Sequence, residues 1–399
     1  MKNKIFTIIL LSIILSLTVS TFCHSQDRSL DGLIEEFYPN GALNAQRMYS
    51  NGKLQGLSKS FYESGKLMSE ANYKDDLLDG LYKTYYENGK LYFEKNFSYG
   101  IQFKEAKEYY ESGLIKNIEQ YKDDELEGES KYFYENGNLN YLMNFRNGRL
   151  QGASEEYYRN GNIKSEGNYK NGEWDGIVKE YDEDGILQNE WSYKNGNREG
   201  TSRIYYNNGD LKWEADFRGD EINGLSFAYS ENGMIVMEAN FRNGRLNGEV
   251  KERYEDGALK SITEYKDDVK DGPAKEYFLN GNISIERKYK DGNEVGVSKE
   301  YYDDGGLWVE RVYFNENRDG SLREYYKTSD LKQEWDVRGG LIEGKSTSYY
   351  KTGEKMSEEN YIDGKRDGLN AFFYQDGRLS HEDTYLNGVK MGRKMHNRE

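Results

Sequence analysis

Glycines recur every 24 residues along this chain, without any insertion or deletion. One series begins at Gly41 and returns at each step to Gly377, with Ser329 as its exception. A second series runs in the same phase from Gly32 to Gly392, with Lys104 as its exception. Two series that hold one phase over 15 repeats predict an array built from one small module.

Each repeat contains a turn signal between two aromatic-rich segments. In the repeat of residues 80–104, which serves as the specimen, this signal is Asn88-Gly89. The residue before the glycine is Asn, Asp, Ser or Thr in all 15 repeats. Such a pair is typical of a two-residue type I′ hairpin turn, in which both residues have positive φ. With this turn, Tyr86 is expected to pair with Leu91, and Tyr85 with Tyr92.

Positions that are equivalent from repeat to repeat are named here by their residue in the specimen. The Tyr86 position is aromatic in 13 of 15 repeats, and Asp182 and Ser230 are its exceptions. The Leu91 and Phe97 positions are almost as uniform, and we expect all three on one sheet face. The Tyr85 position is expected on the opposite face among charged neighbours.

The predicted fold is all-β: an elongated array of about 15 antiparallel β-hairpins that form a single continuous twisted sheet. The predicted domains are a secretory signal peptide over residues 1–25, the repeat array over 26–392 and a short C-terminal tail over 393–399. The return turns between hairpins, such as Asn147 to Gly152, carry two glycines four residues apart.

The first 25 residues have the composition of a secretory signal. Lys2 and Lys4 precede an apolar run from Ile5 to Val19, and small residues precede the Ser25-Gln26 junction. We therefore expect cleavage near that junction and export to the periplasm, cell surface or medium. Lipid attachment at Cys23, the only cysteine, is the alternative.

Without the signal, the chain has 53 basic and 71 acidic residues, which gives a net charge of −18. Such a surface repels phosphate backbones and anionic headgroups, so neither nucleic-acid binding nor anionic-membrane binding is expected. The 37 tyrosines and 16 phenylalanines supply apolar area that disordered chains lack.

The repeated pattern, roughly G-x-x-x-x-Y-Y-x-N-G-x-L-x-x-E-x-x-Y-x-N-G-x-x-x-G, resembles the MORN repeat in its bacterial variant form. It is similar to the YwqK-type family that is labelled as antitoxins, and the resemblance covers about residues 30–392. The resemblance implies a scaffold fold, and with it an antitoxin-like role as one possible function.

No pattern of catalytic or cofactor-binding residues stands out. After the signal, the only histidines are His381 and His396, and neither belongs to a zinc-binding motif. A catalytic carboxylate should appear as a singular residue, whereas the Glu94 position holds glutamate in most repeats and is expected to be solvated. We therefore expect no enzyme activity and no cofactor.

Five return turns replace a glycine by an acid. These acids are Asp76, Asp124, Asp220, Asp268 and Glu316. Carboxylates in a turn can bind Ca²⁺ through their oxygens, but Asp is also a common turn former. The sequence leaves both interpretations open.

The tryptophans break the uniformity of the repeats and are the candidate partner-binding residues. They are Trp174, Trp191, Trp213, Trp308 and Trp335. Aromatic anchors dominate many interfaces, although local packing is the alternative role. With Asp182 and Ser230 nearby, an altered surface around residues 174–237 is expected.

These features favour a non-enzymatic exported scaffold that binds protein partners along an extended aromatic-rich face. The alternatives are an antitoxin or immunity-like protein, and an adhesin that binds carbohydrate in the cell envelope. A possible polysaccharide partner therefore stands beside the protein partner.

Overall fold

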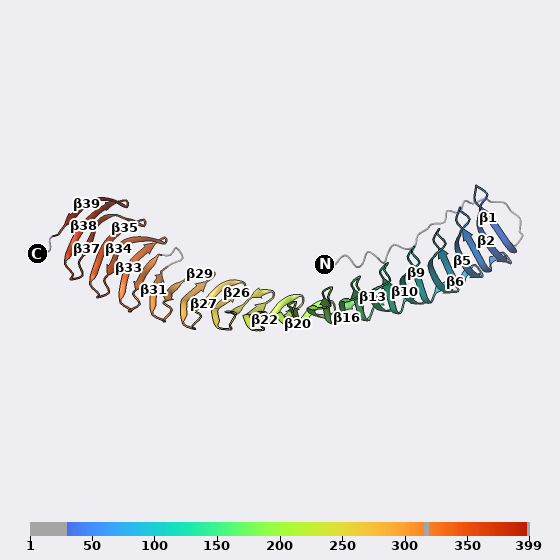
Figure 1. Cartoon of the computed structure of the whole chain (residues 1–399), viewed down its shortest axis with the longest axis horizontal. Helices are drawn as coiled ribbons and strands as arrows, with labels where there is room; N and C mark the ends of the chain where they lie inside the picture. Colours follow the sequence, from blue (N-terminus) through green and yellow to red (C-terminus); the bar gives the residue numbers. More distant parts are fainter. Residues whose placement is uncertain (1–29, 315–318, 397–399) are drawn as a thin grey trace. The chain divides into compact units, whose positions relative to one another are not determined.

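The computed structural model describes residues 30–314 and 319–396. The predicted signal peptide and its cleavage site, Glu316 and the last three residues of the tail lie outside the described residues. The chain divides into an N-terminal part, residues 30–113 with 122–124, and a C-terminal part, residues 114–121 with 125–396. In each part, successive hairpins lie side by side (Figure 1).

All described strands are antiparallel members of one sheet. The N-terminal part contains β1 (Gly32–Phe37), β2 (Leu43–Ser50), β3 (Lys53–Leu54), β4 (Gly56–Phe61), β5 (Leu67–Lys74), β6 (Leu77–Tyr85), β7 (Leu91–Ser98), β8 (Ile101–Gln102) and β9 (Lys104–Tyr109). The first strands of the C-terminal part are β10 (Ile115–Lys122), β11 (Glu125–Leu126), β12 (Gly128–Phe133), β13 (Leu139–Arg146), β14 (Arg149–Leu150), β15 (Gly152–Tyr157), β16 (Ile163–Lys170), β17 (Glu173–Trp174), β18 (Gly176–Tyr181), β19 (Leu187–Lys194), β20 (Asn197–Tyr205), β21 (Leu211–Arg218), β22 (Glu221–Tyr229), β23 (Ile235–Arg242), β24 (Arg245–Leu246) and β25 (Gly248–Arg253). Its remaining strands are β26 (Leu259–Lys266), β27 (Val269–Tyr277), β28 (Ile283–Lys290), β29 (Asn293–Glu294), β30 (Gly296–Tyr301), β31 (Leu307–Tyr313), β32 (Gly320–Tyr325), β33 (Leu331–Arg338), β34 (Leu341–Tyr349), β35 (Lys355–Ile362), β36 (Lys365–Arg366), β37 (Gly368–Phe373), β38 (Leu379–Leu386) and β39 (Val389–Met395). The predicted all-β array of antiparallel hairpins is thereby confirmed.

The hairpin loops differ from the predicted type I′ turn. The Gly89 N–H donates to the Tyr86 carbonyl at 2.8 Å, and the Tyr86 N–H donates to the Lys90 carbonyl at 2.8 Å. Gly89 has a φ of 86°, whereas Asn88 is not among the residues with positive φ. The loop therefore holds three residues and ends on a left-handed glycine.

This longer loop changes the predicted pairing. Tyr85 pairs with Leu91, and a bulge lies between Thr84 and Tyr85. The predicted pairs Tyr86 with Leu91 and Tyr85 with Tyr92 are therefore wrong, because the loop takes up one residue more on the first strand.

Type I′ turns occur instead at the return turns. Arg146 pairs with Arg149, and the two residues between them, Asn147 and Gly148, have φ values of 48° and 70°. The predicted type I′ turn at Asn88-Gly89 is therefore wrong, and Asn-Gly pairs form this turn at the other end of the hairpin.

Asparagine at the hairpin loop has a different role from the predicted one. The Asn88 side-chain oxygen accepts the Lys90 N–H at 2.9 Å, and its amide nitrogen donates to the Glu111 carbonyl in the next repeat at 3.1 Å. Asparagine suits this position because its amide both accepts and donates, not because it tolerates positive φ.

The two sheet faces have different contents. On one face, which we call the aromatic face, the Tyr82 ring meets those of Phe93 and Phe97 at 5.5 and 6.3 Å. At the centre of this face in the C-terminal part lie small side chains with almost no exposed surface, Ser202, Ala215, Ser226 and Ala239. The opposite face carries the Tyr85 and Glu94 positions.

Among the described residues there is no helix, and hence none long and apolar enough to cross a membrane.

Candidate binding surface

Two of the five candidate tryptophans are joined by a cationic and aromatic cluster. The Arg198 guanidinium on β20 lies over the Trp191 ring of β19, 4.1 Å from its centroid. It also lies 5.3 Å from the centroid of Phe217 on β21, whose ring meets that of Trp213 edge-on at 6.1 Å. We call Trp191, Arg198, Trp213 and Phe217 the Arg198 cluster.

The Arg198 cluster is fixed by its immediate neighbours. The Glu180 carboxylate accepts hydrogen bonds from the Trp191 indole nitrogen at 3.1 Å and from the Asn189 amide at 2.9 Å. The Asp220 carboxylate accepts the Arg198 backbone N–H at 2.9 Å. Phe217 is buried, whereas Arg198 is half-buried.

The two interruptions of the Tyr86 position lie on either side of this cluster in the sequence. Asp182 folds back on its own loop and accepts the Ile186 N–H at 2.8 Å. The Ser230 hydroxyl similarly donates within its own loop, to the Met234 carbonyl at 3.2 Å. The repeats around the cluster are therefore altered at the loop edge, as well as at the tryptophans.

The other three tryptophans do not join the cluster. Trp174 stacks on Tyr169 at 3.7 Å and covers Gly167, where an added Cβ would come within 2.9 Å of its ring. Trp335 is half-buried on β33, paired with Leu322. These two tryptophans therefore pack within the sheet.

Trp308 is the most exposed of the candidates. It is 40% exposed, its ring lies 6.0 Å from that of Tyr302, and its indole nitrogen donates to Glu324 at 3.3 Å. It forms a separate, smaller aromatic surface.

The prediction that the Glu94 position is simply solvated is wrong. Glu190 is 18% exposed, accepts the Tyr205 hydroxyl of the next repeat at 2.8 Å and lies 3.8 Å from Arg203. The same bond from the following repeat joins Tyr85 to Glu70, Tyr109 to Glu94, Tyr181 to Glu166, Tyr229 to Glu214, Tyr301 to Glu286 and Tyr349 to Glu334. Burial, followed by the hydrogen bond to Glu190, raises the pKa of Tyr205 to about 12. These glutamates hold repeats together.

The acidic return turns also have structural partners. The carboxylates of Asp76, Asp124, Asp220 and Asp268 each accept a backbone N–H from the preceding repeat, at 2.7 to 2.9 Å. Over residues 30–314 and 319–396, no group of three or more His, Cys, Asp or Glu side chains is arranged to hold a metal ion.

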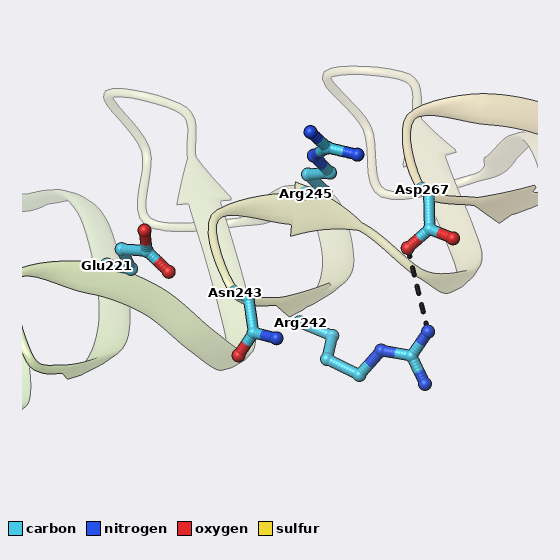
Figure 2. A pocket seen from close by; sticks show the side chains of 5 residues that line it. All are labelled: Glu221, Arg242, Asn243, Arg245 and Asp267. Atoms are coloured by element: carbon cyan, nitrogen blue, oxygen red, sulfur yellow. Dashed lines mark ion pairs between the residues drawn. The ribbon is translucent and has the colours of Figure 1, made fainter.

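An open hollow of about 540 Å³ lies among return turns of the C-terminal part. Its lining residues are Glu221, Arg242, Asn243, Arg245 and Asp267. Figure 2 shows these side chains on successive turns, with Arg242 directed toward Asp267 at 3.5 Å. The hollow is polar and shallow, and its charges are of both signs.

Sequence reasoning did not single out Arg198 or Glu180. The signal was nevertheless present, because seven described repeats carry an aliphatic residue at the Arg198 position: Leu54, Leu78, Leu126, Leu150, Ile222, Leu246 and Ile342. An arginine in such a position, seven residues after a tryptophan, is a singular feature of this repeat.

A chain made of 24-residue hairpins that bond to one another belongs to the class of β-hairpin repeat proteins. The model of the MORN repeat variant family matches eleven segments, at residues 30–51, 54–75, 78–99, 126–147, 150–171, 174–195, 222–243, 246–267, 270–291, 294–315 and 342–363. These segments cover more than half of the chain, which therefore belongs to the MORN repeat variant family. MORN repeats occur in repeat scaffolds and in proteins that mediate protein interactions.

No curated protein matches this chain. Among solved structures, it is similar to TcdB2-TccC3, with 11% identity and a TM-score of 0.17 over 90% of this chain and 23% of that one. It is also similar to the Photorhabdus luminescens Tc holotoxin pore with the mutation TccC3-D651A, with 11% identity and a TM-score of 0.14 over 89% of this chain and 22% of that one. The chain thus spans less than a quarter of the length of these structures.

Proposed function

We propose that the protein is an exported, non-enzymatic scaffold that binds protein partners along its aromatic face, with the Arg198 cluster as the anchor. The observation that carries this proposal is the cluster itself: two tryptophans joined through a guanidinium and a buried phenylalanine.

The uniform positions and the positions that differ between repeats have separate roles, and this supports the proposal. The uniform positions bond one repeat to the next, as the Tyr205 hydroxyl does to Glu190. Such residues are already committed to the fold, so recognition falls to the positions that differ between repeats. Trp191, Arg198 and Trp213 are at such differing positions, and they meet around Phe217 in the Arg198 cluster.

Binding through several repeats also suits the chemistry of the surface. Tyrosine and tryptophan offer large contact areas with few rotatable bonds. Several weak contacts on one array add through effective concentration. The proposed export rests on the signal-like composition of residues 1–25, and it would place the partner outside the cytoplasm.

The test is affinity capture with residues 26–399 as bait, against solubilised envelope proteins, against a cytoplasmic extract and, separately, against immobilised envelope polysaccharide. The proposal expects one or more proteins to be retained in amounts comparable to the bait, with no retention on polysaccharide. Retention on polysaccharide alone would favour an adhesin. Capture of a single toxin from the cytoplasm would favour an antitoxin-like protein.

A further inference from the structure

We propose that Arg198 receives the carboxylate of an acidic side chain of the protein partner. This inference rests on the proposed function and specifies the chemistry of its anchor.

The evidence comes from comparing repeats at two positions seven residues apart, on either side of the return turn. In three repeats these positions hold opposite charges: Arg287 and Glu294 at 3.9 Å, Glu359 and Arg366 at 2.5 Å, and Asp383 and Lys390 at 2.8 Å. The backbone therefore brings these two positions into contact in each of these repeats.

In the repeat of Arg198, the position of the carboxylate is occupied by Trp191. Arg198 corresponds to Arg366, and Trp191 corresponds to Glu359. Arg198 thus stands where Arg366 and Lys390 have an acidic partner, yet it forms no ion pair with any carboxylate in the described part of the chain.

The contacts of Arg198 leave its donors available. Trp191 and Phe217 contact the guanidinium through their rings, and neither side chain offers an oxygen acceptor to its five N–H groups. A stacked, half-buried arginine has already lost part of its rotamer freedom, so less entropy is lost when it binds. A carboxylate matches this planar set of donors in a two-point interaction.

The surroundings favour a protein carboxylate over a freely solvated anion. The indole rings of Trp191 and Trp213 offer apolar contact beside the cation, which suits a carboxylate flanked by side chains. The chain carries a net charge of −16, so acidic ligands are repelled elsewhere and binding at Arg198 has to be local.

The experiment uses the full chain and measures the fluorescence anisotropy of a labelled, end-capped hexaglutamate peptide at low ionic strength. Hexaglutamine serves as the neutral probe, and oligogalacturonate as the acidic sugar probe. We expect hexaglutamate to bind and both other probes to bind at least about ten-fold more weakly, which corresponds to the loss of one charge-assisted pair.

Two variants remove the site in different ways. Arg198→Leu introduces a leucine, which other repeats carry at this position as Leu126 and Leu150, so the hairpin should fold. Trp191→Glu gives Arg198 an internal carboxylate, as Glu359 does for Arg366. Both should weaken hexaglutamate binding about ten-fold. The control Arg366→Leu, which breaks a pair already satisfied within the chain, should leave binding unchanged.

Unchanged binding in Arg198→Leu with a native circular dichroism spectrum would overturn the inference, as would equal binding of hexaglutamine. Binding of oligogalacturonate in place of hexaglutamate would also overturn it. In each of these cases the scaffold proposal stands if envelope proteins are still captured by the bait, so the two failures are distinguishable.

Discussion

The Tyr134 hydroxyl donates a hydrogen bond to the Tyr157 carbonyl oxygen, 2.8 Å away in the next repeat. The same bond over 23 residues recurs from Tyr38, Tyr62, Tyr86, Tyr158, Tyr206, Tyr254, Tyr302, Tyr326 and Tyr350. This ladder explains the near-uniform tyrosine at this position, because the hydroxyl ties each hairpin to the backbone of its neighbour.

Loss of one such hydroxyl should weaken the array. Tyr134→Phe removes the bond to Tyr157 and should lower the free energy of unfolding by about 1 kcal/mol. Phe278 is the natural phenylalanine at this position, and Phe278→Tyr should raise the free energy by a similar amount. Urea titrations of the two variants check this pair, and equal stability of all three proteins would contradict the role of the ladder.

High pH should break the hydrogen bonds between tyrosine and glutamate. The pKa values of Tyr205 and Tyr229 are raised to about 12, first by burial and then by their hydrogen bonds to Glu190 and Glu214. Because an unfolded tyrosine titrates near 10, these groups stabilise the fold fully below about pH 10, and the contribution is lost as the pH rises toward 12. Tyrosinate absorbance should therefore rise together with loss of the β-sheet circular dichroism signal. Full titration near pH 10 with the sheet intact would contradict this.

The C-terminal strand should depend on one buried carboxylate. Asp383 is 1% exposed, and hydrogen bonds from Arg393, at 2.6 and 2.8 Å, and from Lys390, at 2.8 Å, hold its pKa well below the usual range. Its contribution to stability is present above about pH 4 and lost as the pH falls further. Asp383→Asn should cost about 2 kcal/mol at neutral pH, measured by urea unfolding.

The matched control for Asp383→Asn is Glu255→Gln, which neutralises an exposed carboxylate in a hairpin loop. This control should change the stability by less than about 0.5 kcal/mol. A similar cost for both variants would mean that Asp383 acts only through the net charge.

The two kinds of turn should respond differently to substitution. Gly89 has a φ of 86°, and Gly89→Val should cost about 2 kcal/mol, because a β-branched residue resists a left-handed conformation. Gly148→Asp should be nearly neutral, because Asp76 adopts a φ of 68° at the equivalent position and its carboxylate accepts the Leu54 N–H at 2.7 Å. Thermal unfolding of both variants checks this, and equal losses would contradict the assignment of the turns.

The sequence predicted the hairpins, the repeat length and the aromatic positions, because these depend on local turn chemistry and alternation. It did not predict the loop type, since the choice between two and three loop residues depends on bonds such as that from Asn88 to Glu111. Those bonds join residues one repeat apart, and they become visible only when the register between hairpins is known.

The candidate surface was predicted only in part, and the reason is similar. The tryptophans stood out as singular residues, and the structure brings Trp191 and Trp213 together through Arg198 and Phe217. The sequence alone did not indicate Arg198, because its role emerges only when the contacts of equivalent positions are compared between repeats. The contacts of Arg366 with Glu359 and of Lys390 with Asp383 show how a cation at the Arg198 position can be paired within its own repeat.

The central claim is that several repeats bind one protein partner jointly, and the most direct measurement is partner affinity across a series that lacks whole repeats. Removing residues 248–271, and then residues 248–295, leaves the Arg198 cluster intact and keeps the phase of the array. The account predicts that affinity for the captured partner falls several-fold with each step, while circular dichroism per residue is retained. Full affinity in both shortened proteins would contradict joint binding by the repeats.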